Sequence, residues 1–111
     1  MKVNVIGSGI TKFGELWEED LRSIAFTAGF SAVSEAGVGF KDIDALYIAN
    51  MNSAVFSGQE HLGALIASDL GLNCPSMGIE GACASGSLAI NAAFNAIRSG
   101  LYKTILVIGV E

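Results

Sequence analysis

The sequence predicts an α/β fold in which strands and helices alternate as βαβαβαβ around a largely parallel sheet. Two apolar runs, residues 45–49 and 104–110, have the length and composition of strands covered on both faces. Three other segments carry apolar residues at helical spacing, and each of them ends at a glycine. The 111 residues suffice for one domain, 1–111, and are too few to suggest two.

The first half of the chain contains two predicted strands with a helix between them. A β-branched run at residues 3–6 is a strand that a glycine-rich turn stops. The acidic cluster at 18–20 suits the positive end of a helix dipole, and helical spacing then predicts a helix over 21–36. The buried strand at 45–49 follows.

The second half repeats this alternation. Helical spacing over residues 59–70 predicts a second helix, and 75–80 is assigned as a short strand although it contains Pro75. The alanine-rich helix over 83–99 is apolar on several faces, which predicts burial and self-association. The strand at 104–110 is expected at the centre of the sheet, although connections this short cannot fix the strand order.

Composition excludes several classes of function. The net charge is −5 and the six Lys and Arg residues are scattered, so no basic stripe exists for nucleic acid. No apolar run approaches bilayer length and no signal peptide is evident, so we expect a cytoplasmic protein without a membrane span. One His and two Cys are too few for a zinc site, and we expect no disulfide between Cys74 and Cys83.

The glycines after the first predicted strand do not form a dinucleotide-binding motif. Gly7 and Gly9 match the start of G-x-G-x-x-G, but Lys12 occupies the place of the third glycine. These glycines are therefore interpreted as turn residues, and a nucleotide-binding domain is disfavoured.

Cys83 is the candidate nucleophile. It lies in a run of small residues at the predicted start of a helix, where unpaired N–H groups and the helix dipole favour the thiolate. Small neighbours leave room for a substrate, and attack on a carbonyl is the natural use of such a thiol. The alternative is a buried, inert cysteine that serves as a small hydrophobic residue.

Two ionisable residues are weighed as partners of this thiol. His61 could act as its base, but its polar neighbours favour an exposed position or local hydrogen bonds. Glu80 is close in sequence, but a carboxylate beside Cys83 would disfavour the thiolate, so Glu80 is interpreted as a positioning or interface residue.

Together these segments resemble the thiolase family. Residues 80–86 match its reactive-cysteine segment of the form E-x-x-C-A-S-G, which places the acyl-accepting role on Cys83. Residues 57–61 and 70–72 resemble the sterol-carrier-protein-like and archaeal acetyl-CoA acetyltransferase branch, and 106–111 resembles the strand after the cysteine helix.

The resemblance implies a thiolase-like layered fold, of which this chain would form part of the N-terminal half. It implies an acyltransferase of lipid metabolism with coenzyme A thioesters as substrates, no bound cofactor, and a homodimer contact near residues 77–80. In that family, the part matched here is followed by the histidine that activates the cysteine. The groups that stabilise the carbanion and the loops that bind coenzyme A also come after it. The chain alone is therefore expected to be inactive, and no coenzyme-binding residue is assigned.

Two other functions stay open at this point. A related condensing enzyme, such as a ketoacyl synthase or hydroxymethylglutaryl-CoA synthase, also seats a cysteine at a helix start, although the sequence after Cys83 favours thiolase. A non-catalytic assembly module would use the apolar helix and strands only to build an interface.

Overall fold

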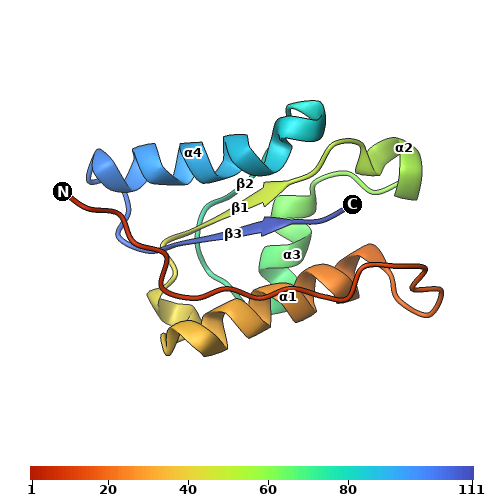
Figure 1. The fold of residues 1–111 in the computed structure, drawn as a ribbon, viewed down its shortest axis with the longest axis horizontal. Helices are drawn as coiled ribbons and strands as arrows, with labels where there is room; N and C mark the ends of the chain where they lie inside the picture. The colour runs from red at the N-terminus through yellow and green to blue at the C-terminus, as the bar shows by residue number, and fades with distance from the viewer.

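The protein has three layers, with a parallel sheet between two layers of helices (Figure 1). The structure is a computed structural model that describes residues 1–111. Three strands make up the sheet in the order β2-β1-β3: β1 (Ala45–Ala49), β2 (Ser76–Ile79) and β3 (Ile105–Gly109). One face is covered by α1 (Leu21–Ala36) and α3 (Leu62–Leu70), and the other by α4 (Ser85–Arg98). The predicted α/β fold class is confirmed.

The core forms on both faces of β1. All five residues of this strand are buried, as the continuous apolar run at 45–49 predicts. Leu46 and Ile48 lie in the larger cluster, which also includes Ile66 of α3. Tyr47 belongs to a smaller cluster with Ala93 of α4. Alternate side chains of the central strand therefore hold both helical layers in place.

The boundaries of α1 follow from local chemistry. Asp20 caps the helix by accepting a hydrogen bond from the Ser23 N–H at 2.7 Å, and the Ser23 hydroxyl accepts one from the Asp20 N–H. Gly37 ends the helix with φ 69°, a left-handed conformation that glycine adopts without strain. The prediction of a helix over 21–36 is confirmed to the residue.

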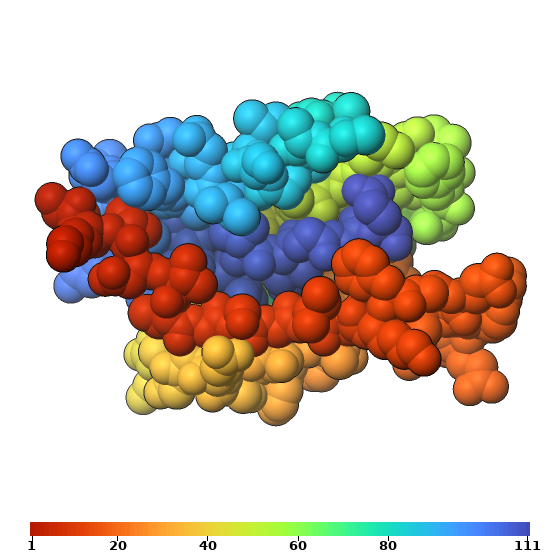
Figure 2. All heavy atoms as spheres, viewed as in Figure 1, coloured from red at the N-terminus to blue at the C-terminus, as the bar shows by residue number.

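The strand predicted at residues 3–6 is wrong. This segment pairs with no strand, and the chain directly after it runs along α1 on the surface of the molecule (Figure 2). The contact is close: a Cβ at Gly7 or Gly9 would lie 2.4 Å from a carbonyl oxygen of α1, that of Ala32 or Ala28. An extended run forms a strand only beside another strand, and residues 3–6 pair with none.

The central position predicted for 104–110 is also wrong. β1 takes the centre, and β3 pairs with it in parallel from Ala45 opposite Ile105 to Ala49 opposite Gly109. β3 is consequently an edge strand with alternate rather than continuous burial. Its carboxyl end and that of β1 lie at the same edge of the sheet.

Several short elements and boundaries differ from the prediction. A short helix α2 (Ser53–Ser57) and two 3-10 turns, Phe40–Asp42 and Ala82–Ala84, occupy segments expected to be irregular or part of a helix. The third helix begins at Leu62 rather than at residue 59, because His61 has a left-handed backbone with φ 56°. None of the helices combines the length and the apolar character needed to cross a bilayer.

Candidate active site

Cys83 lies in the 3-10 turn Ala82–Ala84, which joins β2 to α4. The sequence predicts that Cys83 is the first residue of the helix. In the structure α4 begins at Ser85, so Cys83 lies two residues before the helix. The side chain is exposed. Cys83 is therefore not the buried core residue of the alternative interpretation, and it stands at the amino end of a helix of 14 residues.

The backbone of this turn is held in an uncommon conformation. Ala82, directly before the cysteine, has φ 51°, in the left-handed region that residues with a Cβ rarely adopt. Such a backbone costs roughly 1–2 kcal/mol and persists only where surrounding contacts enforce it. Strain of this kind directly beside a candidate nucleophile is typical of a functional turn.

Hydrogen bonds within the turn supply those contacts. The Ser85 hydroxyl donates to the Ala82 carbonyl at 2.6 Å and accepts from the Gly81 N–H at 3.0 Å. The Ala84 N–H donates to the Gly81 carbonyl at 3.0 Å, and the Glu80 carboxylate accepts from the Ala82 N–H. The segment that carries Cys83 is thus tied on both sides of the thiol.

The small residues around Cys83 have a steric reason in one case. A Cβ at Gly81 would lie 2.2 Å from Leu88 Cδ1, so any larger residue would require the half-exposed Leu88 side chain to move. At Gly86, by contrast, a Cβ would meet nothing within 4 Å, which leaves open space next to the thiol-bearing turn.

Cys74 differs from Cys83 in its surroundings. It is half-buried, and burial raises the pKa of its thiol, with a smaller upward contribution from the nearby Asp44 carboxylate. Both cysteines are free thiols.

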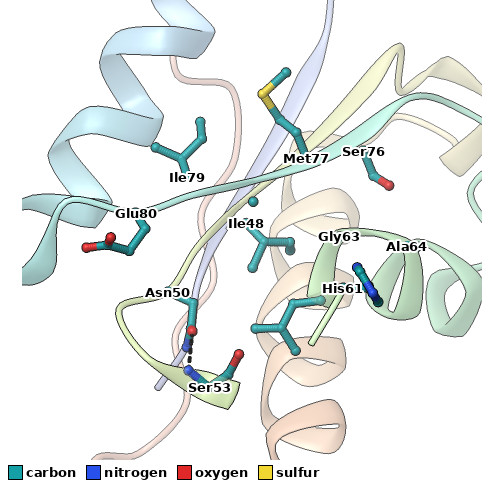
Figure 3. A pocket seen from close by; sticks show the side chains of 12 residues that line it. Ile48, Asn50, Ser53, His61, Gly63, Ala64, Ser76, Met77, Ile79 and Glu80 are labelled. Atoms are coloured by element: carbon teal, nitrogen blue, oxygen red, sulfur yellow. Dashed lines mark hydrogen bonds between the residues drawn. The ribbon is translucent and has the colours of Figure 1, made fainter. Parts of the chain in front are cut away.

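The structure does not bring His61 to Cys83. His61 is about nine-tenths exposed, and its nearest charged partner is Glu60, with Nε2 and Oε2 3.9 Å apart. It lines a pocket of about 470 Å³ along β2 and the start of α3, and Cys83 is absent from that lining. Glu80 lines the same pocket, on the side away from His61 (Figure 3).

Two residues near these sites were missed by sequence reasoning. Asn50 follows β1, donates to the Val110 carbonyl at 2.7 Å and accepts from the Ser53 N–H at 2.8 Å, so it ties the ends of β1, β3 and α2 together (Figure 3). Ser85 is 4% exposed and organises the cysteine turn. An Asn directly after a buried strand is the signal that could have found Asn50, whereas a Ser at a helix start normally indicates a cap and gives no signal of the role of Ser85.

No group of three or more His, Cys, Asp or Glu side chains comes together as a metal site would require. This region presents a single exposed thiol, that of Cys83, on a hydrogen-bonded turn. Such an arrangement can carry an acyl group as a thioester.

Comparison with known proteins finds matches along nearly the whole chain. The family model described as thiolase, N-terminal domain, matches residues 3–111. The acetyl-CoA acetyltransferases of Methanocaldococcus jannaschii and Methanothermobacter thermautotrophicus are 52% and 44% identical over 110 residues. Each alignment covers 98% of this chain, and 28% and 29% of the respective relative.

A solved structure supports the same fold. The acetyl-CoA acetyltransferase from Syntrophomonas wolfei superposes with a TM-score of 0.77 at 24% identity, over 93% of this chain and 27% of its own. The chain thus spans less than a third of the length of the relatives it matches. With the family match over nearly its whole length, this chain belongs to the thiolase N-terminal domain family.

Proposed function

We propose that this chain supplies the acyl-accepting cysteine of a thiolase-type acetyl-CoA acetyltransferase, with Cys83 as the nucleophile. The observation that carries the proposal is the exposed Cys83 thiol on a strained, hydrogen-bonded turn at the start of α4. Relatives named acetyl-CoA acetyltransferases, at 44–52% identity, support the choice of reaction.

The first half-reaction is acyl transfer to the cysteine. The Cys83 thiolate attacks the carbonyl carbon of acetyl-CoA, and the bond between that carbon and the coenzyme A sulfur breaks. Coenzyme A leaves as a thiolate that takes up a proton, and the acetyl group remains on Cys83 Sγ. Coenzyme A thioesters are substrates in this scheme rather than bound cofactors.

The second half-reaction forms a carbon–carbon bond. A base removes a proton from the methyl carbon of a second acetyl-CoA, and the resulting carbanion attacks the acetyl carbonyl on Cys83. The thioester bond to Sγ breaks, which regenerates the Cys83 thiolate and releases acetoacetyl-CoA. The reverse sequence is thiolytic cleavage of a 3-oxoacyl-CoA.

Within this chain, the backbone has one further role in the proposal. In both steps negative charge develops on the carbonyl oxygen, and a fixed N–H donor lowers the barrier because it needs no reorganisation. The Cys83 N–H is the proposed donor from this chain. The activating base and the group that removes the carbon-bound proton are expected outside residues 1–111, and the proposed setting is the cytoplasm.

Peptide mapping after incubation with acetyl-CoA tests the proposal. In the full chain as the cell makes it, the acetyl group should appear on the peptide that contains Cys83, and C83A should abolish both this label and acetoacetyl-CoA formation. C74A is the matched control and should retain both. Acetyl transfer that survives C83A would refute the proposal. Product that requires a malonyl thioester would favour the ketoacyl synthase alternative.

A further inference from the structure

We propose that Ser85 is a positioning residue for the reaction of Cys83, acting through the backbone of the turn. This inference rests on the proposed function. It assigns to the Ser85 hydroxyl the task of holding the cysteine in one orientation, a role separate from the nucleophile itself.

The hydroxyl of Ser85 connects the two residues that precede the cysteine. Its oxygen accepts the Gly81 N–H at 3.0 Å while its proton goes to the Ala82 carbonyl at 2.6 Å. The side chain is 4% exposed, so water does not readily replace either bond. Cys83 is two residues away and points into solvent from the turn that these bonds close.

These contacts differ from those of an ordinary helix cap. A capping side chain accepts from N–H groups of the following turn, at the second or third position of the helix. The Ser85 hydroxyl instead reaches backwards to residues 81 and 82, and the residue at the cap position of α4 is Ala84, which makes no side-chain bond. The hydroxyl therefore holds the cysteine turn and does not cap α4.

The left-handed backbone at Ala82 is what makes this support necessary. If the Ala82 carbonyl loses its hydrogen bond from the Ser85 hydroxyl, Ala82 can relax toward an ordinary backbone conformation. The peptide plane that joins Ala82 to Cys83 then rotates. That rotation moves both the Cys83 N–H and the thiol. Misplacement of a reacting group by about 1 Å is enough to cost on the order of a hundredfold in rate.

The test compares S85A with S87A in the full chain. Ser87 is an exposed serine in the first turn of α4, so S87A removes a hydroxyl from the same helix without touching the turn. For S85A we expect kcat for acetyl transfer to fall by about tenfold to a hundredfold with KM for acetyl-CoA little changed. S87A should match the unaltered protein in both constants.

The outcomes separate this inference from the proposed function. If C83A leaves acetyl transfer intact, the proposed function fails. If C83A abolishes transfer but folded S85A has the same kcat as S87A, Ser85 is only structural and the present inference is overturned.

A second variant covers the case in which S85A does not fold. A82G removes the strain of the left-handed alanine, so the A82G/S85A double variant should fold where S85A alone does not. Its kcat should stay at least about tenfold below that of A82G alone. Equal kcat values in A82G and the double variant would overturn the positioning role.

Discussion

At the residue scale, the two cysteines should differ in reactivity. Cys83 is exposed at the amino end of α4, whereas Cys74 is half-buried and burial raises the pKa of its thiol. Because the thiolate is the reactive form, brief alkylation near neutral pH should label Cys83 first. Peptide mapping of the folded protein measures this.

Unfolding the protein in urea supplies the control for this prediction. Both thiols are then in water, and the difference in labelling should disappear. Preferential labelling of Cys74 in the folded state, or equal labelling of the two thiols there, would count against Cys83 as the nucleophile.

The residues of the cysteine turn were only partly predictable from sequence. The sequence makes Cys83 a candidate because small residues and a helix start leave a local signature. The left-handed Ala82 and the backward hydrogen bonds of Ser85 left none, because alanine has no intrinsic preference for φ 51° and a serine at a helix start normally indicates a cap.

At the element scale, Asp44 ties β1 to the start of β3. Its Oδ2 accepts the Lys103 and Thr104 N–H groups at 2.8 and 3.0 Å, and these bonds hold the pKa of the carboxyl below its usual value. At pH 7 we expect D44N to lower the free energy of unfolding by about 1 kcal/mol, a value reduced for the partial exposure of the site.

The pH dependence of this effect has a definite sign. A lowered folded-state pKa means that the carboxylate stabilises the fold fully above the unfolded-state pKa, near about 4, and loses this as pH falls through the lower folded value. The free energy of unfolding, measured in urea, should therefore differ less between D44N and the unaltered protein below about pH 4 than at pH 7. A difference that is constant from pH 7 to about pH 3 would show that charge is not its source.

Helices and strands differed in how well the sequence predicted them. The helix over 21–36 and the strand at 45–49 were found because capping residues and continuous apolar runs are local signals. The strand expected at 3–6 and the central place expected for β3 were wrong, because pairing depends on which segments meet in space.

At the scale of the whole molecule, the exposed apolar surface predicts self-association. Several large apolar side chains are more than half exposed, among them Trp17 at 85% and Ile90 at 64%, and Met77 is about half exposed on the free edge of β2. An unpaired strand edge beside an apolar side chain is suited to pairing with a second copy. Sedimentation at about ten micromolar should show a dimer or larger species.

The variant M77K places a charge on the β2 edge and should shift the protein toward monomer. I90K makes the matched change on the exposed face of α4 and tests whether this helix shares the contact. If β2 alone forms the contact, I90K should leave the assembly intact. A stable monomer of the unaltered protein would contradict self-association, and dissociation by I90K alone would move the contact from β2 to α4.

The last prediction is that residues 1–111 alone cannot complete the reaction. Condensation needs a base to activate the cysteine and a second group to take a proton from carbon, and each such contribution is typically worth about a hundredfold or more. The one histidine of residues 1–111, His61, is exposed, and Cys83 is not among the residues that line its pocket. Acetyl-CoA should therefore acylate Cys83 slowly at most, without forming acetoacetyl-CoA.

The full chain should restore condensation, and C83A should abolish it again. Acetoacetyl-CoA from residues 1–111 alone would overturn this expectation, and its loss in H61A would then identify His61 as the base.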